Sequence, residues 1–137
     1  MENIAPIAFF VHLELGGYER PKHEVQVSGE LLEYWVTEPC AMQPPPRQRV
    51  RPSARQWTTF WAEMEKIGVW KWLPEYDSGA LDGIQWELEL RCGDRRLKSM
   101  GSNSYPGHPE PGFTQKCAFG QFVKALERLI GPGTRIR

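Results

Sequence analysis

An amphipathic helix is encoded between residues 53 and 68, and it restricts the fold more than any other segment. Its apolar side chains recur at helical spacing and share one face: Trp57, Phe60, Trp61, Met64 and Ile67. Ser53 and Gln56 match the capping box, in which the serine caps a backbone amide and the glutamine reaches back. Gly68 supplies the left-handed residue that ends many helices. We expect the apolar face of this helix to lie across a sheet.

A β-hairpin is predicted for residues 84–100. Its first strand alternates, and four apolar side chains are expected to face inward: Ile84, Trp86, Leu88 and Leu90. Gly93-Asp94 fits a two-residue turn with glycine first. This turn places Leu90 opposite Leu97, so that an apolar pair lies on the inner face of the ribbon.

The whole chain, residues 1–137, is predicted to form one α+β domain. Further strands are expected at 7–15, 24–27, 31–37 and, as a short edge strand, 47–52, with a second helix at about 113–130. These elements give a single antiparallel sheet of about 4–6 strands with two helices packed on one face, in the order strands, helix, hairpin, helix. The tail, about residues 131–137, is expected to be loose.

The charge balance excludes a strong general attraction to polyanions. Lys and Arg together number 17, as do Asp and Glu, so the chain is formally neutral. A neutral chain is not drawn to nucleic acid or to an acidic membrane surface. The charges are unevenly spread, however: residues 47–55 hold four arginines and no acid, whereas residues 56–90 hold seven acids and two bases. We therefore expect surface patches of opposite sign.

The cysteines and the apolar runs together suggest a location in the cytoplasm. Cys40, Cys92 and Cys117 lie far apart without a C-x-x-C pair, which is typical of free thiols in a reducing cytosol. No apolar run approaches the ~20 residues that span a bilayer. The N-terminal segment is typical of a strand rather than a signal peptide. We expect a cytoplasmic protein with no cofactor and no membrane partner.

The order of segments resembles a known family. The strand pair FFVHLELGGYE, the helix QWTTFWAEMEKIGVW and the segment DGIQWELELRCGDRRLKSMGSNSYP follow one another as in small bacterial domains of the emfourin type, which are protealysin inhibitors. The region from Trp57 to Pro106 is also similar to uncharacterised bacterial proteins with a W-x-x-F-W helix, a D-G-x-x-W strand and a G-S-N-x-Y-P loop. The resemblance implies a binding or inhibitory role without catalysis.

An arginine stripe is the first candidate site. Arg47, Arg49 and Arg51 alternate along the predicted edge strand and therefore share a face, with Arg55 beyond them. Such a stripe can hold phosphates or an acidic partner, because the guanidinium fork pairs bidentately. The alternative is a charged edge strand that prevents edge-to-edge aggregation, with the arginines paired to glutamates elsewhere.

Aromatic residues and one loop supply further candidates. Trp70, Trp72 and Tyr76 belong to an aromatic cluster that either fills the gap between helix and sheet or exposes an interface anchor. Tyr105 lies in the loop 101–106, whose hydroxyl and amide groups suggest either a small binding site or a turn capped by its own side chains. These four residues and the arginine stripe form the predicted contact set.

Catalytic and metal-binding patterns are weak. His12, His23 and His108 are separated and form no H-x-x-x-H, so no metal site is expected. There is no G-x-S-x-G nucleophile elbow, and nothing in the sequence suggests a histidine that activates a cysteine. An enzyme would need a pocket near Ser102, Asn103 and Asp82.

The sequence therefore favours a non-enzymatic module that binds another macromolecule, most simply a protein, as an inhibitor or accessory subunit. One alternative is an accessory subunit that contacts nucleic acid. It would use two basic groups lying on one face: Arg47, Arg49, Arg51, Arg91, Arg95, Arg96 and Lys98. A small enzyme of unknown class is the other alternative.

Overall fold

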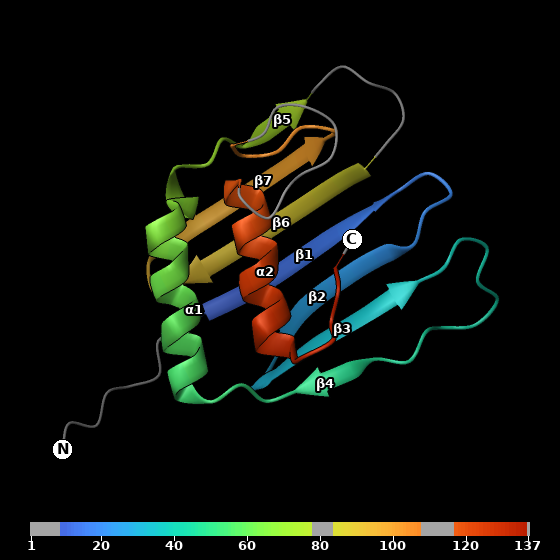
Figure 1. Cartoon of the computed structure of the whole chain (residues 1–137), viewed down its shortest axis with the longest axis horizontal. Helices are drawn as coiled ribbons and strands as arrows, with labels where there is room; N and C mark the ends of the chain where they lie inside the picture. Colours follow the sequence, from blue (N-terminus) through green and yellow to red (C-terminus); the bar gives the residue numbers. More distant parts are fainter. Residues whose placement is uncertain (1–8, 78–83, 108–116, 137) are drawn as a thin grey trace.

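The computed structural model describes residues 9–77, 84–107 and 117–136. The described chain forms strands, two α-helices and one 3-10 turn, shown in Figure 1. In chain order these are β1 (Phe9–Gly17), β2 (Lys22–Ser28), β3 (Leu31–Thr37), β4 (Gln48–Val50), α1 (Ala54–Ile67), η1 (Val69–Lys71), β5 (Glu75–Asp77), β6 (Ile84–Cys92), β7 (Arg95–Ser102) and α2 (Ala118–Ile130).

The strands form one mixed sheet in the order β4-β3-β2-β1-β6-β7-β5. The α+β class and the single sheet agree with the prediction, but the sheet has seven strands rather than 4–6. It is also not wholly antiparallel, because β5 pairs with β7 in parallel through Glu75 and Met100. The extra strand was missed because its three residues are too few to show an alternating pattern.

Both helices lie on one face of the sheet, as predicted (Figure 1). The core between the two layers contains alternate residues of the central strands, such as Val11, Leu13 and Leu88, which are at most 2% exposed. Phe60 and Met64 of α1 and the apolar stripe of α2 complete this core. The other face of the sheet, hereafter the open face, is covered by neither helix.

The local predictions for α1 and the hairpin are confirmed. Ser53 and Gln56 form both hydrogen bonds of a capping box, and Gly68 ends α1 in the left-handed conformation at φ 82°. In the hairpin, Leu90 pairs with Leu97. The helix α2 begins at Ala118, within the predicted 113–130, of which residues 113–116 lie outside the described part.

The C-terminal tail is fixed on the domain, contrary to the prediction of a loose end. Ile136 is fully buried, and its backbone amide donates to Oε2 of Glu127, 2.8 Å away. The carbonyl of Arg135 accepts a hydrogen bond from the hydroxyl of Tyr34 on β3. A single apolar residue in a polar tail gave too weak a signal to predict this contact.

No helix in the described part of the chain is long and apolar enough to cross a membrane.

Candidate binding face

The open face is made by the side chains that alternate with the core residues. On the central strands β2, β1, β6 and β7 these side chains are mostly polar or charged: Glu24, Gln26, His12, Glu14, Gln85, Glu87, Glu89, Arg91, Arg96 and Lys98. Two apolar side chains share this face: Met100, which is 43% exposed, and Phe10, whose ring lies under the guanidinium of Arg91. Period-two alternation puts all of them on the surface opposite the helices.

Three glutamates form a row across the middle of the open face. Glu14 on β1 lies directly opposite Glu24 on β2 and, on its other side, directly opposite Glu87 on β6. Like charges in directly opposed positions destabilise a sheet, typically by a few tenths of a kcal/mol. We call Glu24, Glu14 and Glu87 the acidic row.

The acidic row is only partly neutralised within the chain. The ammonium of Lys22 lies 2.6 Å from Oε1 of Glu14. The pKa of Lys22 is raised, first by its hydrogen bond with Glu14 and then by the charges of all three glutamates, while partial burial opposes the shift. The indole of Trp35 donates to Oε2 of Glu24 at 2.8 Å. No ion pair joins Glu87 to a cation among the described residues.

Two hollows border Glu87 on the open face. The larger, of about 470 Å³, has an apolar wall that includes Pro74 and Met100 and polar walls that include His12, Glu89 and Lys98. The second, of about 340 Å³, lies beside Glu14 and Lys22, where Gly16 and Gly17 offer no side chain to fill it. Together they place carboxylates beside apolar surface, which suits a long aliphatic side chain with a cationic end.

The arginine stripe is engaged within the chain. Arg49 donates to Oε2 of Glu33 at 2.6 Å, and Arg47 lies 3.4 Å from Oε1 of the same carboxylate. Arg47 also stacks over the ring of Trp35, and Arg51 pairs with Glu30. These contacts fit the paired edge strand better than a free phosphate site.

The predicted aromatic contacts lie far from the arginine stripe, because β4 and β5 are opposite edges of the sheet. Trp70 is half-buried and stacks on Trp61, while Trp72 packs against Phe119 and Phe122 in the core. Because η1 is a 3-10 turn rather than an extended segment, both indoles can pack against other residues of the domain. The half-buried Tyr76 packs against Trp86.

Tyr105 is 1% exposed, so it belongs to the core rather than to a contact surface. The loop around it holds the sheet together: Asn103 accepts from the amide of Ile84, and the indole of Trp86 donates to the carbonyl of Ser104. Gly101 and Ser102 belong to β7. Asp82, the third residue of the enzyme hypothesis, lies outside the described residues.

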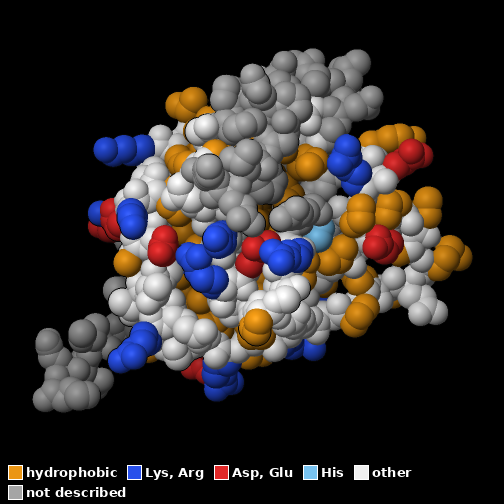
Figure 2. Space-filling view, in the orientation of Figure 1, with side chains coloured by type: hydrophobic (Ala, Val, Ile, Leu, Met, Phe, Trp, Pro, Cys, Tyr) orange, Lys and Arg blue, Asp and Glu red, His pale blue; other side chains and the backbone are white. Residues whose placement is uncertain are grey.

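The two basic groups of the nucleic-acid hypothesis lie on one face, because Arg49 is opposite Glu33 and Glu33 is opposite Gln26 of the open face, but they do not form one patch. Arg49 on β4 and Arg96 on β7 are separated by four strands, roughly 24 Å at ~4.8 Å per strand. Arg95 lies on the helix side, where it pairs with Glu65 of α1. Figure 2 shows that helix-covered side, where basic and acidic side chains are interleaved over the visible described surface.

The acidic row was not predicted from the sequence, although part of its signal is present there. His12 and Glu14 are two residues apart on a strand, so they share a face. The hairpin that follows, with its turn after Gly17, pairs Glu14 with Glu24. The contribution of Glu87 could not be found in this way, because the pairing of β1 with β6 joins segments far apart in the chain.

Neither a protein-family model nor a curated protein matches this chain. The likeness to emfourin-type inhibitors therefore stays a prediction from the sequence.

Proposed function

We propose that this chain is a non-enzymatic module that binds a partner protein, and that its open face takes a segment bearing lysine or arginine side chains. The observation that supports the proposal most is the acidic row on a sheet face that neither α1 nor α2 covers. Only one internal cation, Lys22, serves its three carboxylates among the described residues.

The chemistry of the larger hollow indicates which side chains fit. Pro74 and Met100 offer apolar surface to a methylene chain, and Glu87 lies at the border with the second hollow. Lysine and arginine combine such a chain with a cationic head. Charge complementarity of this kind contributes mainly to specificity and to the rate of association.

Glu87 is the residue whose removal tests the proposal most cleanly. It is exposed and forms no ion pair among the described residues, so Glu87→Gln keeps the shape of the surface and removes only charge. An ion pair at an exposed carboxylate contributes about 0.2–1 kcal/mol, so its loss weakens binding by up to about fivefold. Glu63→Gln on α1 removes the same charge from the helix side, where Glu63 pairs with Arg128, and is the control.

The experiment is an NMR titration of the ¹⁵N-labelled chain with a short peptide that alternates arginine or lysine with alanine, in the presence of EDTA. We expect shifts on β1, β6 and β7, binding that is weaker by up to about fivefold in Glu87→Gln, and unchanged binding by Glu63→Gln. Shifts confined to the helices, or equal effects of the two variants, would contradict the proposal. A parallel titration with duplex DNA that binds more tightly than the peptide would favour the nucleic-acid alternative.

A further inference from the structure

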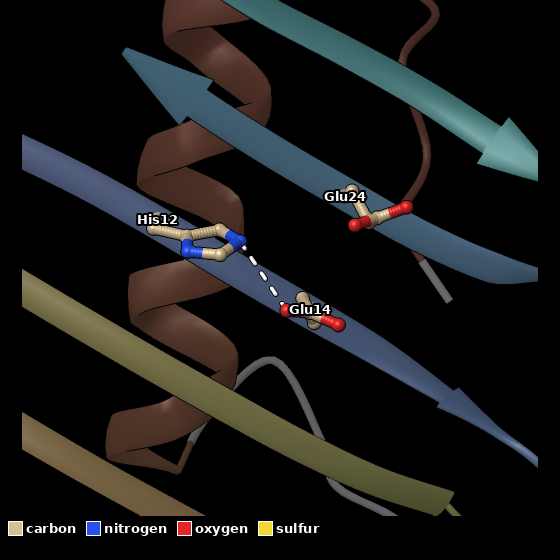
Figure 3. Close-up of side chains that lie close together, drawn as sticks. All are labelled: His12, Glu14 and Glu24. Atoms are coloured by element: carbon tan, nitrogen blue, oxygen red, sulfur yellow. Dashed lines mark ion pairs between the residues drawn. The ribbon is translucent and has the colours of Figure 1, made fainter.

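Three metal-ligating side chains converge on the open face. His12 and Glu14 come from β1 and Glu24 from β2, and one donor atom of each lies within 4.8 Å of the other two. Figure 3 shows the imidazole and the carboxylate of Glu14 turned toward each other, with Glu24 on the neighbouring strand. All three residues are carried by paired strands, which hold a site more firmly than loops do.

One distance in this cluster already matches metal coordination. Nε2 of His12 and Oε2 of Glu14 are 3.4 Å apart. Two donors bound to one Zn²⁺ at 2.0–2.1 Å with a tetrahedral angle lie about 3.3 Å apart. An ion can therefore bridge this pair without moving the backbone, and Glu24 offers a third donor atom within 4.8 Å of the other two.

Each carboxylate is oriented by a donor that leaves its second oxygen for an ion. Lys22 contacts Oε1 of Glu14, which leaves Oε2 facing the imidazole. Trp35 donates to Oε2 of Glu24, which leaves Oε1 for a ligand. Hydrogen bonds to ligating carboxylates are a regular part of metal sites, and their loss typically lowers metal affinity 10–100-fold.

The negative charge of the region favours a divalent cation, and the imidazole favours a transition metal over Mg²⁺ or Ca²⁺. Glu14 has a carboxylate directly opposite it on each neighbouring strand, and Lys22 supplies a single positive charge. Mg²⁺ and Ca²⁺ prefer all-oxygen sites, whereas an imidazole nitrogen suits zinc and its neighbours. We propose that His12, Glu14 and Glu24 bind one divalent transition-metal ion on the open face, with water completing its coordination.

This inference does not rest on the proposed function, although both involve Glu14 and Glu24. A basic peptide needs the carboxylates but not the imidazole, whereas the metal needs His12 and does not need Glu87. The two proposals therefore fail independently: His12→Gln tests the metal site, and the peptide titration in EDTA tests the binding face.

The test is calorimetric titration of the metal-free chain with Zn²⁺, in a Cys40→Ser background because Cys40 is an exposed free thiol. We expect one ion per chain, and at least a tenfold loss of affinity in His12→Gln and in Glu24→Gln. Glu89→Gln is the matched control, because Glu89 lies opposite His12 and carries the same charge without belonging to the ligand set. It should change the affinity less than threefold.

The imidazole resonances give a second measurement that does not depend on stability. Zn²⁺ should shift the ring signals of His12 and leave those of His23, which is 7% exposed and bonded to Tyr34. No zinc binding, full binding by His12→Gln, an equal loss in Glu89→Gln or equal binding of Mg²⁺ would each overturn the proposal. Circular dichroism of every variant separates loss of the site from loss of the fold.

Discussion

Gly101→Ala should destabilise the domain strongly, because the indole of Trp86 occupies the space of the missing side chain. A Cβ at position 101 would lie 2.2 Å from Nε1 of Trp86 and 2.6 Å from the carbonyl oxygen of Ser104. Trp86 is 1% exposed and packs on Phe119 with ring centroids 4.7 Å apart. Any shift of the indole therefore disturbs its packing on Phe119.

The expected cost combines two effects. Overpacking a dense core costs about 1–3 kcal/mol. Displacing the indole also weakens its 3.0 Å hydrogen bond to Ser104, which contributes about 1 kcal/mol. The free energy of unfolding should fall by about 3 kcal/mol, and the melting temperature by about 10 °C in a chain of this length.

Urea denaturation followed by circular dichroism measures this change, and two further variants test its cause. Met100→Ala alters the neighbouring residue, whose side chain points to the open face, and should cost less than about 1 kcal/mol. In the double variant Gly101→Ala/Trp86→Phe the two effects should not add, because the smaller ring relieves the clash. The reasoning is refuted if Gly101→Ala is as mild as Met100→Ala, or if the two effects are additive.

Three other perturbations test separate parts of the structure. Ser53→Ala removes the N-cap of α1 and should cost about 1 kcal/mol in urea denaturation. Glu33→Gln deprives Arg47 and Arg49 of their shared carboxylate and should cost about 1 kcal/mol, with a smaller difference from wild type in high salt. Burial raises the pKa of Tyr105 to about 12, above the value near 10 of an unfolded chain. The folded state then keeps its proton longer, so the free energy of unfolding should fall between about pH 10 and 12, by up to about 1.4 kcal/mol per pH unit from this group. Tyr105→Phe should make the slope shallower, while the raised pKa values of Tyr34 and Lys22 keep part of it.

Local signals in the sequence were sufficient for the elements whose geometry is local. The capping box, the left-handed Gly68 and the hairpin register were all predicted, because each depends on residues a few positions apart. The parallel pairing of β5 with β7 and the burial of Ile136 depend on contacts between distant segments. Neither leaves a periodic pattern in the residues that make it.

In the candidate site, too, contacts within one strand could be predicted from the sequence, whereas the relative positions of distant segments could not. The sequence predicted that Arg47 and Arg49 share a face, and both reach Glu33. It could not predict that the aromatic residues near Trp70 lie at the opposite edge of the sheet, because the strand order was unknown. A contact set chosen by residue type was therefore divided between two edges.

The acidic row is difficult to explain by the needs of the fold alone. Glu14 and Glu24 have internal partners, Lys22 and Trp35, that account for their carboxylates. Glu87 forms no ion pair in the described part of the chain, and it faces Glu14 across the strand pair, where a glutamine would avoid the repulsion. Its repulsion from Glu14 opposes folding, its attraction to Lys22 offsets part of that cost, and its charge raises the negative potential beside two hollows. A cationic group from outside the chain compensates this repulsion, because all three carboxylates attract it.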